Sequence, residues 1–232
     1  MSLTWHQFAK KEELDQQLAG FIAERLRTAI ARDGRASLAV SGGRTPAGMF
    51  RALQALEIDW QQVDITLVDE RWVPNDHADS NERLTRENLL QGPVAAATFH
   101  SMVNDAATPH DGLSGIEARL SNMKTPIDIL ILGMGDDGHT ASLFPQAPEL
   151  EAACASTALV AAINPVTAPH LRITLTLPAI AAAAAIAVHI TGDSKKTLLE
   201  TALAEDKPLT EQYPIRRVLD RVAGKAHVFW AA

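Results

Sequence analysis

Two kinds of apolar pattern alternate along the chain. Short runs bounded by glycine or polar residues are uniformly apolar at 129–132 and largely apolar at 37–40, 64–68 and 185–190. Such runs are typical of strands that are buried on both faces of a parallel sheet. Between them lie longer segments in which apolar residues recur every three or four positions, as in helices that pack one face against a sheet. The alternation predicts an α/β fold with a mainly parallel sheet and helices on both faces.

The longest predicted helix covers residues 10–33, and Gly34 is expected to end it. Its apolar residues keep a spacing of four: Leu14, Leu18, Ile22, Leu26 and Ile30. Further helices are predicted at 46–56, 80–90, 112–123, 177–183 and 194–203. Further strands are predicted at 3–8, 98–102, 158–163 and 228–230. No repeat, low-complexity tract or flexible linker divides these elements, so we expect a single domain over residues 1–232.

Composition and charge limit the kinds of molecule that the protein is expected to bind. The 232 residues are 47% hydrophobic and carry a formal net charge of −7, so there is no basic field to attract nucleic acid or an anionic membrane surface. The single cysteine, Cys154, cannot form an intramolecular disulfide, which favours a reducing compartment. No secretory signal is evident, and the most apolar run, 179–188, is too short to cross a bilayer. We therefore expect a cytoplasmic protein that binds neither nucleic acid nor membrane.

A glycine-rich stretch follows the predicted strand 129–132. Its three glycines allow a sharp turn and a close approach of the backbone to a ligand, and it also carries Asp137 and His139. In open α/β sheets, ligands bind at the carboxyl ends of the strands. We expect the chemistry of the protein in this loop.

The predicted strand 37–40 is followed by a second glycine turn, Ser41-Gly42-Gly43-Arg44-Thr45. Pro46 suits the first turn of the helix that comes next. Free backbone N–H groups and the positive end of a helix favour an anion at such a turn, and the two hydroxyls and the arginine add donors. The sequence therefore predicts a phosphate-binding loop at residues 41–45.

Three cationic residues follow or begin other predicted elements. Arg71 comes after the strand 64–68, Lys195 follows the glycine after strand 185–190, and Arg172 begins an alternating segment. A lysine in the first turn of a helix places a positive charge at the positive end of the helix dipole, which costs some stability. Because this placement is unfavourable by itself, we expect Lys195 or its neighbour Lys196 to have a ligand-binding role. Because parallel strands end at one edge of the sheet, we expect these cations near the two glycine loops.

A histidine beside an acid, with cations nearby, suits the hydrolysis of a carbonyl compound. His139 would take a proton from water, and Asp137 would fix the imidazole tautomer and stabilise the imidazolium. Arg71 or Lys195 would stabilise the developing oxyanion.

Other chemistries fit the sequence less well. A metal site would favour histidines or cysteines at short spacing, whereas the histidines at 100, 110, 139, 170 and 189 are scattered, and we expect no metal. The G-x-S-x-G elbow of serine hydrolases is absent. A dinucleotide-binding turn at Gly133, Gly135 and Gly138 stays open as a poorer alternative, because it comes too late in the chain for the usual first βαβ unit.

Five stretches of the chain, in this order, resemble those of the 6-phosphogluconolactonase family: 41–45, 69–71, 133–145, 172–174 and 192–195. The resemblance implies a Rossmann-like sheet of the sugar-phosphate isomerase and deaminase type. It also implies hydrolysis of 6-phospho-D-glucono-1,5-lactone to 6-phosphogluconate, the second step of the oxidative pentose phosphate pathway, without a cofactor. The partner is then a phosphorylated sugar lactone. The oligomeric state stays open between a monomer and a weak dimer.

The resemblance also implies roles for individual residues. His139 matches the general base, Asp137 its acidic partner, and Arg71 and Lys195 the cationic residues of the pocket. The loop 41–45 matches the phosphate cradle, and Arg172 matches a pocket or substrate-phosphate arginine. Asp136 stands where many relatives have proline.

Two other functions are compatible with this fold: deamination of an amino-sugar phosphate and non-catalytic sensing of a sugar phosphate. Glucosamine-6-phosphate deaminases share the Asp-Gly-His core but carry a glutamate just before the proline, where this chain has Phe144 before Pro145. Without that carboxylate an acid–base group for amino-sugar ring opening is missing, so the lactonase is favoured. A non-catalytic sugar-phosphate sensor would carry a DNA-binding helix-turn-helix, and the single long helix predicted at the N-terminus leaves no room for one.

Overall fold

A seven-stranded parallel sheet forms the centre of the computed structural model, which describes residues 3–43, 45–204, 208, 212–222 and 224–232. Its strands lie in the order β1-β10-β9-β6-β2-β3-β5, and every neighbouring pair is parallel. Their bounds are Thr4–Phe8 (β1), Ala36–Val40 (β2), Val63–Leu67 (β3), Thr98–His100 (β5), Ile129–Leu132 (β6), Ala185–Thr191 (β9) and Ala226–Ala231 (β10). The predicted parallel sheet is confirmed.

A second, three-stranded antiparallel sheet lies beside the first. It consists of β4 (Asp69–Arg71), β8 (Arg172–Leu175) and β7 (Val160–Ile163) in the order β4-β8-β7. Val68 joins the two sheets, since its N–H donates to Val40 O and its carbonyl accepts from Leu175 N, both at 2.9 Å. The residues after β3, expected to form a loop, are therefore a strand that turns away from the parallel sheet.

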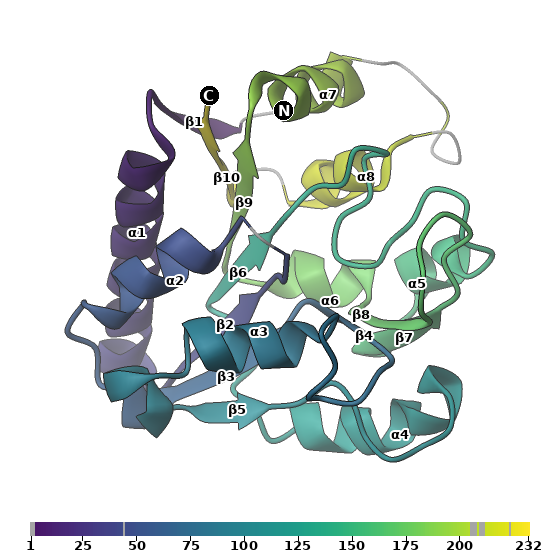
Figure 1. Cartoon of the computed structure of the whole chain (residues 1–232), viewed down its shortest axis with the longest axis horizontal. Helices are drawn as coiled ribbons and strands as arrows, with labels where there is room; N and C mark the ends of the chain where they lie inside the picture. The colour runs from purple at the N-terminus through teal and green to yellow at the C-terminus, as the bar shows by residue number, and fades with distance from the viewer. Residues whose placement is uncertain (1–2, 44, 205–207, 209–211, 223) are drawn as a thin grey trace.

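Helices cover both faces of the large sheet, as predicted. Figure 1 shows α1 and α2 on the left of the sheet, and α4, α5, α6 and α8 on its right together with the small sheet. The helices are α1 (Lys11–Asp33), α2 (Ala47–Gln54), α3 (Asn81–Asn88), α4 (Pro109–Leu120), α5 (Leu150–Ala155), α6 (Leu177–Ala182), α7 (Asp193–Ala204) and α8 (Pro214–Arg221), with two short 3₁₀ turns. None of the helices in the described part of the chain is long and apolar enough to cross a membrane.

The order of the strands reverses between β6 and β2. From β2 the chain proceeds outward to β3 and β5, whereas from β6 it proceeds in the other direction to β9 and β10. A crevice opens at such a switch point outside the carboxyl ends of the strands, and ligands bind there in open α/β sheets. The loops after β2 and β6 are the two glycine turns of the sequence, so the topology brings them together. The buried side chains of all layers form one continuous core, which favours the single domain expected from the sequence.

Candidate active site

The loop after β6 is closed by its own backbone. Gly135 N–H donates to His139 O at 2.8 Å, and Gly138 N–H donates to Gly135 O at 3.1 Å. Gly138 has a φ of +75°, a left-handed conformation that glycine adopts without strain. A β-carbon at Gly135 would overlap with the imidazole of His139 and lie 2.7 Å from an oxygen of Asp137. Glycine at position 135 therefore leaves room for the side chains of His139 and Asp137.

The Asp137 carboxylate holds the His139 ring. Its Oδ1 lies 2.6 Å from His139 Nδ1 and also accepts the backbone N–H of His139 at 3.1 Å. Burial opposes ionisation of Asp137, but the hydrogen bonds from His139 outweigh it and lower the pKa of the carboxyl. A carboxylate only accepts, so Nδ1 carries the proton and Nε2 keeps a free lone pair. This is the tautomer that a general base requires.

An aromatic ring supports the imidazole. The Phe144 ring stacks on His139, with centroids 4.3 Å apart and planes 27° apart. The guanidinium of Arg172 lies 5.8 Å from the centroid of the same ring. Phe144 thus positions the histidine and borders the charged part of the site.

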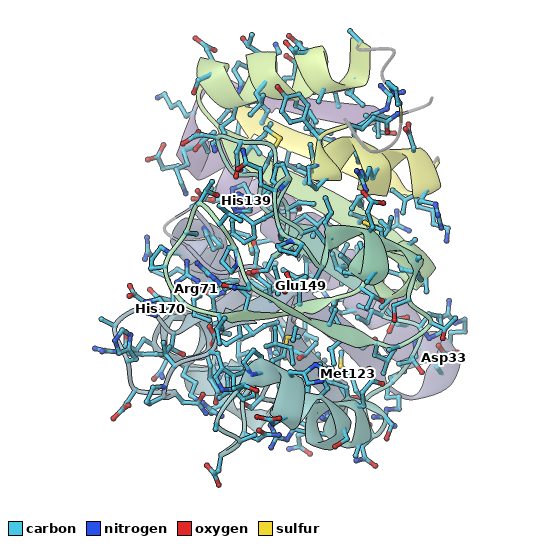
Figure 2. All side chains as sticks on the ribbon, turned by 90° about the vertical axis from the view of Figure 1, so that its right-hand side faces the viewer. Asp33, Arg71, Met123, His139, Glu149 and His170 are labelled. Carbon is cyan, nitrogen blue, oxygen red and sulfur yellow. The ribbon has the colours of Figure 1, made fainter. Side chains whose placement is uncertain are left out.

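A cavity of about 390 Å³ opens in front of the dyad. The predicted site residues that line it come from five segments of the chain: Ser41, Gly42, Gly43, Thr45, Arg71, His139, Arg172 and Lys195. Asp137 is not among the lining residues and stands behind His139. Arg44 lies outside the described residues. Figure 2 shows His139 and Arg71 on the same side of the molecule, with the ring of His139 above Arg71.

Arg71 and Arg172 face each other across the small sheet. They are direct partners in the antiparallel register of β4 and β8, a pairing of like charges that normally destabilises a sheet. Burial, and then the charge of Arg71, lower the pKa of Arg172. Arg71 donates to Asp79 O at 2.6 Å and Arg172 to Pro169 O at 3.0 Å. The Nε of each arginine is buried and has no hydrogen-bond partner among the described residues.

The two acids before Arg71 have different roles. The fully buried Glu70 accepts hydrogen bonds at 2.6–3.1 Å from the backbone N–H groups of Arg71, Asn81 and Glu82 and from Ser80 Oγ. Burial raises the pKa of Glu70 to about 7. Glu70 therefore anchors β4 to the start of α3 and does not reach the cavity.

Asp69 lines the cavity and binds the segment that follows the catalytic loop. Its Oδ2 accepts from Ser142 Oγ at 2.6 Å, and its carbonyl accepts from the side-chain amide of Asn81 at 3.0 Å. The Asn81 amide in turn lies against Gly42, where a β-carbon would overlap with it. Asp69 and Asn81 thus connect the phosphate-binding turn, the small sheet and the catalytic loop.

The lysine that faces the cavity is Lys195. Its Nζ forms an ion pair of 2.7 Å with Asp136 in the catalytic loop, and its side chain is 22% exposed. Lys196 points elsewhere, since its Nζ donates to Gln7 at 2.8 Å and lies 4.3 Å from the ring centroid of Trp230.

Comparison with known proteins shows the family to which the chain belongs. The model of a family described as glucosamine-6-phosphate isomerases/6-phosphogluconolactonase matches residues 9–230. The chain belongs to this family. The 6-phosphogluconolactonase of Neisseria meningitidis serogroup A is 42% identical over 231 residues, which covers 98% of each chain. That of Mesorhizobium japonicum is 42% identical over 232 residues, covering 99% of this chain and 96% of the relative.

A solved structure supports the same relationship. The crystal structure of a 6-phosphogluconolactonase from Shewanella baltica superposes with a TM-score of 0.96 at 44% identity, covering 100% of this chain and 98% of that one. The comparisons confirm the 6-phosphogluconolactonase assignment predicted from the motifs, and with it a Rossmann-like fold of the sugar-phosphate isomerase and deaminase type.

Two residues that line the cavity were not predicted from the sequence. Asn81 follows a helix cap and looked like part of a surface helix, and His189 lies within an apolar strand and looked like a core residue. His189 lines the cavity, and its Nε2 lies 3.6 Å from Asp15 Oδ1. Burial lowers the pKa of His189 to about 3, so the ring is neutral. No local pattern marks either residue, because only the packing of distant elements brings them to the cavity.

Proposed function

We propose that the chain hydrolyses 6-phospho-D-glucono-1,5-lactone to 6-phospho-D-gluconate by general-base activation of water. The observation that carries this proposal is the His139–Asp137 dyad, which opens onto a cavity that also presents Arg71, Arg172 and Lys195. A base oriented by a carboxylate suits water activation, and the excess of cations suits a substrate with a phosphate dianion.

The phosphate binds at the turn 41–45 and the arginine pair. Ser41, Thr45 and the glycine N–H groups line the same cavity as Arg71 and Arg172. The facing guanidinium groups repel each other in the free enzyme, and a dianion bound by both of them offsets that repulsion. This assigns both arginines to the phosphate end of the substrate.

The lactone carbonyl lies at the other end of the cavity, beside His139. Nε2 takes a proton from water as the water oxygen attacks C1, and Asp137 stabilises the imidazolium that forms. Lys195, which is held next to the catalytic loop by Asp136, stabilises the oxyanion. The C1–ring-oxygen bond then breaks, and the imidazolium returns the proton to the departing oxygen. Such a base typically contributes a factor of ~10² to 10⁴ to the rate.

Amino-sugar deamination is disfavoured by Phe144. This side chain is 4% exposed and stacks on His139. The position where a deaminase would need a carboxylate is therefore apolar and already filled.

Two lactones separate the proposed roles of the cations. Acid release from 6-phosphogluconolactone and from unphosphorylated glucono-1,5-lactone is followed at constant pH, with the spontaneous rate subtracted. Arg172→Ala should lower kcat/KM for the phosphorylated lactone by at least 10-fold, with little effect on the unphosphorylated one, whereas Lys195→Ala should lower both. An Arg172→Ala variant that affects both lactones equally would remove Arg172 from the phosphate site. Turnover of glucosamine 6-phosphate in preference to the lactone would overturn the proposed function itself.

A cytoplasmic location follows from the proposed metabolic role and from the single cysteine. Association as a monomer or a weak dimer stays a prediction from the sequence, and sedimentation of the purified protein tests it.

A further inference from the structure

Two loops bring together three potential metal ligands at the rim of the small sheet. His77 and Asp79 lie between β4 and α3, and His170 lies between β7 and β8. One ligand atom of each residue lies within 4.8 Å of the other two. The spacing of 91 residues between Asp79 and His170 hides this cluster in the sequence, where the histidines looked scattered.

The distances in the cluster are close to those around a bound ion. Asp79 Oδ2 lies 2.9 Å from His170 Nε2 and 3.9 Å from His77 Nδ1. Ligand atoms at the Zn–N and Zn–O distances of ~2.0–2.2 Å are about 3.4 Å apart in a tetrahedron. Shifts of about an ångström therefore convert the cluster into a three-ligand site. The side chains of His77 and Asp79 are 42% and 53% exposed, so they have the freedom to make these shifts.

The loops already orient the donors. His77 Nδ1 accepts the backbone N–H of Asp79 at 3.1 Å, so this nitrogen is unprotonated and can coordinate an ion once that hydrogen bond is given up. His170 has a φ of +67°, a conformation that residues other than glycine rarely adopt, and its ring points to the Asp79 carboxylate. Where His170 Nε2 donates its proton to this carboxylate, coordination of an ion by Nε2 requires that proton to move to Nδ1 of the same ring.

One neighbouring charge opposes a cation. Arg71 donates to the backbone carbonyl of Asp79 and lies next to the cluster, as Figure 2 shows for Arg71 and His170. The guanidinium is bound to the carbonyl and leaves the carboxylate oxygen of Asp79 to the histidines. The positive charge of Arg71 weakens the binding of a cation but leaves the ligand atoms accessible to it.

We propose that His77, Asp79 and His170 form a binding site for a divalent transition metal ion such as Zn²⁺, with water in the remaining position. Two imidazoles and one carboxylate are a ligand set that suits this class of ion. The ion joins the loop that follows Arg71 to the loop that leads into Arg172. None of the three ligands lines the cavity in front of the His139–Asp137 dyad, so the role proposed for the ion is to connect the two loops.

Metal binding by the full chain tests the proposal without reference to activity. The purified protein is freed of metal with a chelator and titrated with Co²⁺, whose visible absorption reports ligand geometry, and with Zn²⁺ by calorimetry. We expect one saturable site. His77→Ala and His170→Asn should each weaken binding at least 10-fold, and asparagine at 170 tolerates the positive φ.

Other histidines provide the controls. His110→Ala removes an exposed imidazole outside the cluster and should leave binding unchanged. His227→Ala removes one of a second histidine pair, since its Nδ1 lies 3.1 Å from His6 Nε2. The proposal is overturned if the chain binds no ion stoichiometrically. It is also overturned if binding survives in both His77→Ala and His170→Asn, or is lost only in His227→Ala or His139→Ala.

Discussion

Replacing Asp137 in two ways separates charge from orientation in the catalytic dyad. Asp137 Oδ1 accepts both the ring Nδ1–H and the backbone N–H of His139. In Asp137→Asn the amide oxygen can accept the same two hydrogens, so the ring keeps its direction and its tautomer but loses the negative charge. In Asp137→Ala both hydrogen bonds are lost, and the ring is held only by its stacking on Phe144.

The size of the charge effect follows from the geometry. An imidazolium and a carboxylate whose charges lie about 4 Å apart attract each other by about 4 kcal/mol at an effective dielectric constant of 20. The side chains of His139 and Asp137 are 31% and 38% exposed, and solvent screening reduces the attraction to about 1–2 kcal/mol. Asp137→Asn should therefore lower kcat by about 5- to 30-fold. Asp137→Ala should lower it further, to a total of about 10²- to 10³-fold.

Acid release from 6-phosphogluconolactone at constant pH measures both variants, with the uncatalysed hydrolysis subtracted. Circular dichroism and a thermal melt show whether the fold is retained. Equal losses in the asparagine and alanine variants would mean that orientation contributes nothing. An unchanged kcat in Asp137→Asn would refute the stabilisation of an imidazolium by this carboxylate.

Three further changes test other parts of the site. Asp136→Ala should lower kcat for the phosphorylated lactone by a few-fold, because it removes the ion pair that holds Lys195 beside the loop after β6; an unchanged kcat would show that Lys195 keeps its place without Asp136. Gly135→Ala should reduce turnover at least ~10²-fold by displacing the catalytic ring, whereas Gly20→Ala, whose methyl group meets no atom within 4 Å, should not. The pKa of His189 is about 3 in the folded protein and 6.5 in the unfolded chain. Because only the unfolded chain takes up this proton, the free energy of unfolding should fall as the pH drops below about 6.5, by up to ~1.4 kcal/mol per pH unit. Urea unfolding between pH 7 and 5 should show that the wild type loses more stability per pH unit than His189→Gln does, because the other titrating groups contribute equally to both proteins.

The sequence was sufficient to predict the parallel sheet and the local arrangement of Asp137 and His139 in the loop after β6. Strands buried on both faces are uniformly apolar, so the strand 129–132 was predicted with the bounds that β6 has. The glycines, Asp137 and His139 lie within a few residues of one another, and their relation is set locally by the turn.

The antiparallel sheet and the pairing of Arg71 with Arg172 could not be predicted in this way. β4 has three residues with a charged sequence, and it becomes a strand only because β8, a hundred residues later, supplies its hydrogen bonds. The helix α8 was missed because its buried residues include Arg217, a charged side chain that looked solvent-exposed. The contacts of His77 with His170 are likewise non-local, and spacing along the chain carries no information about them.

The proposed mechanism depends on His139 as the general base, and replacing His139 is the sharpest test of that role. Initial rates of acid release from freshly prepared 6-phosphogluconolactone are compared for the wild type and His139→Ala at equal enzyme concentration, above the spontaneous rate. We expect kcat to fall at least ~10²-fold while the thermal melt and the far-ultraviolet spectrum stay those of the wild type. A folded His139→Ala variant with turnover within two-fold of the wild type would contradict this mechanism.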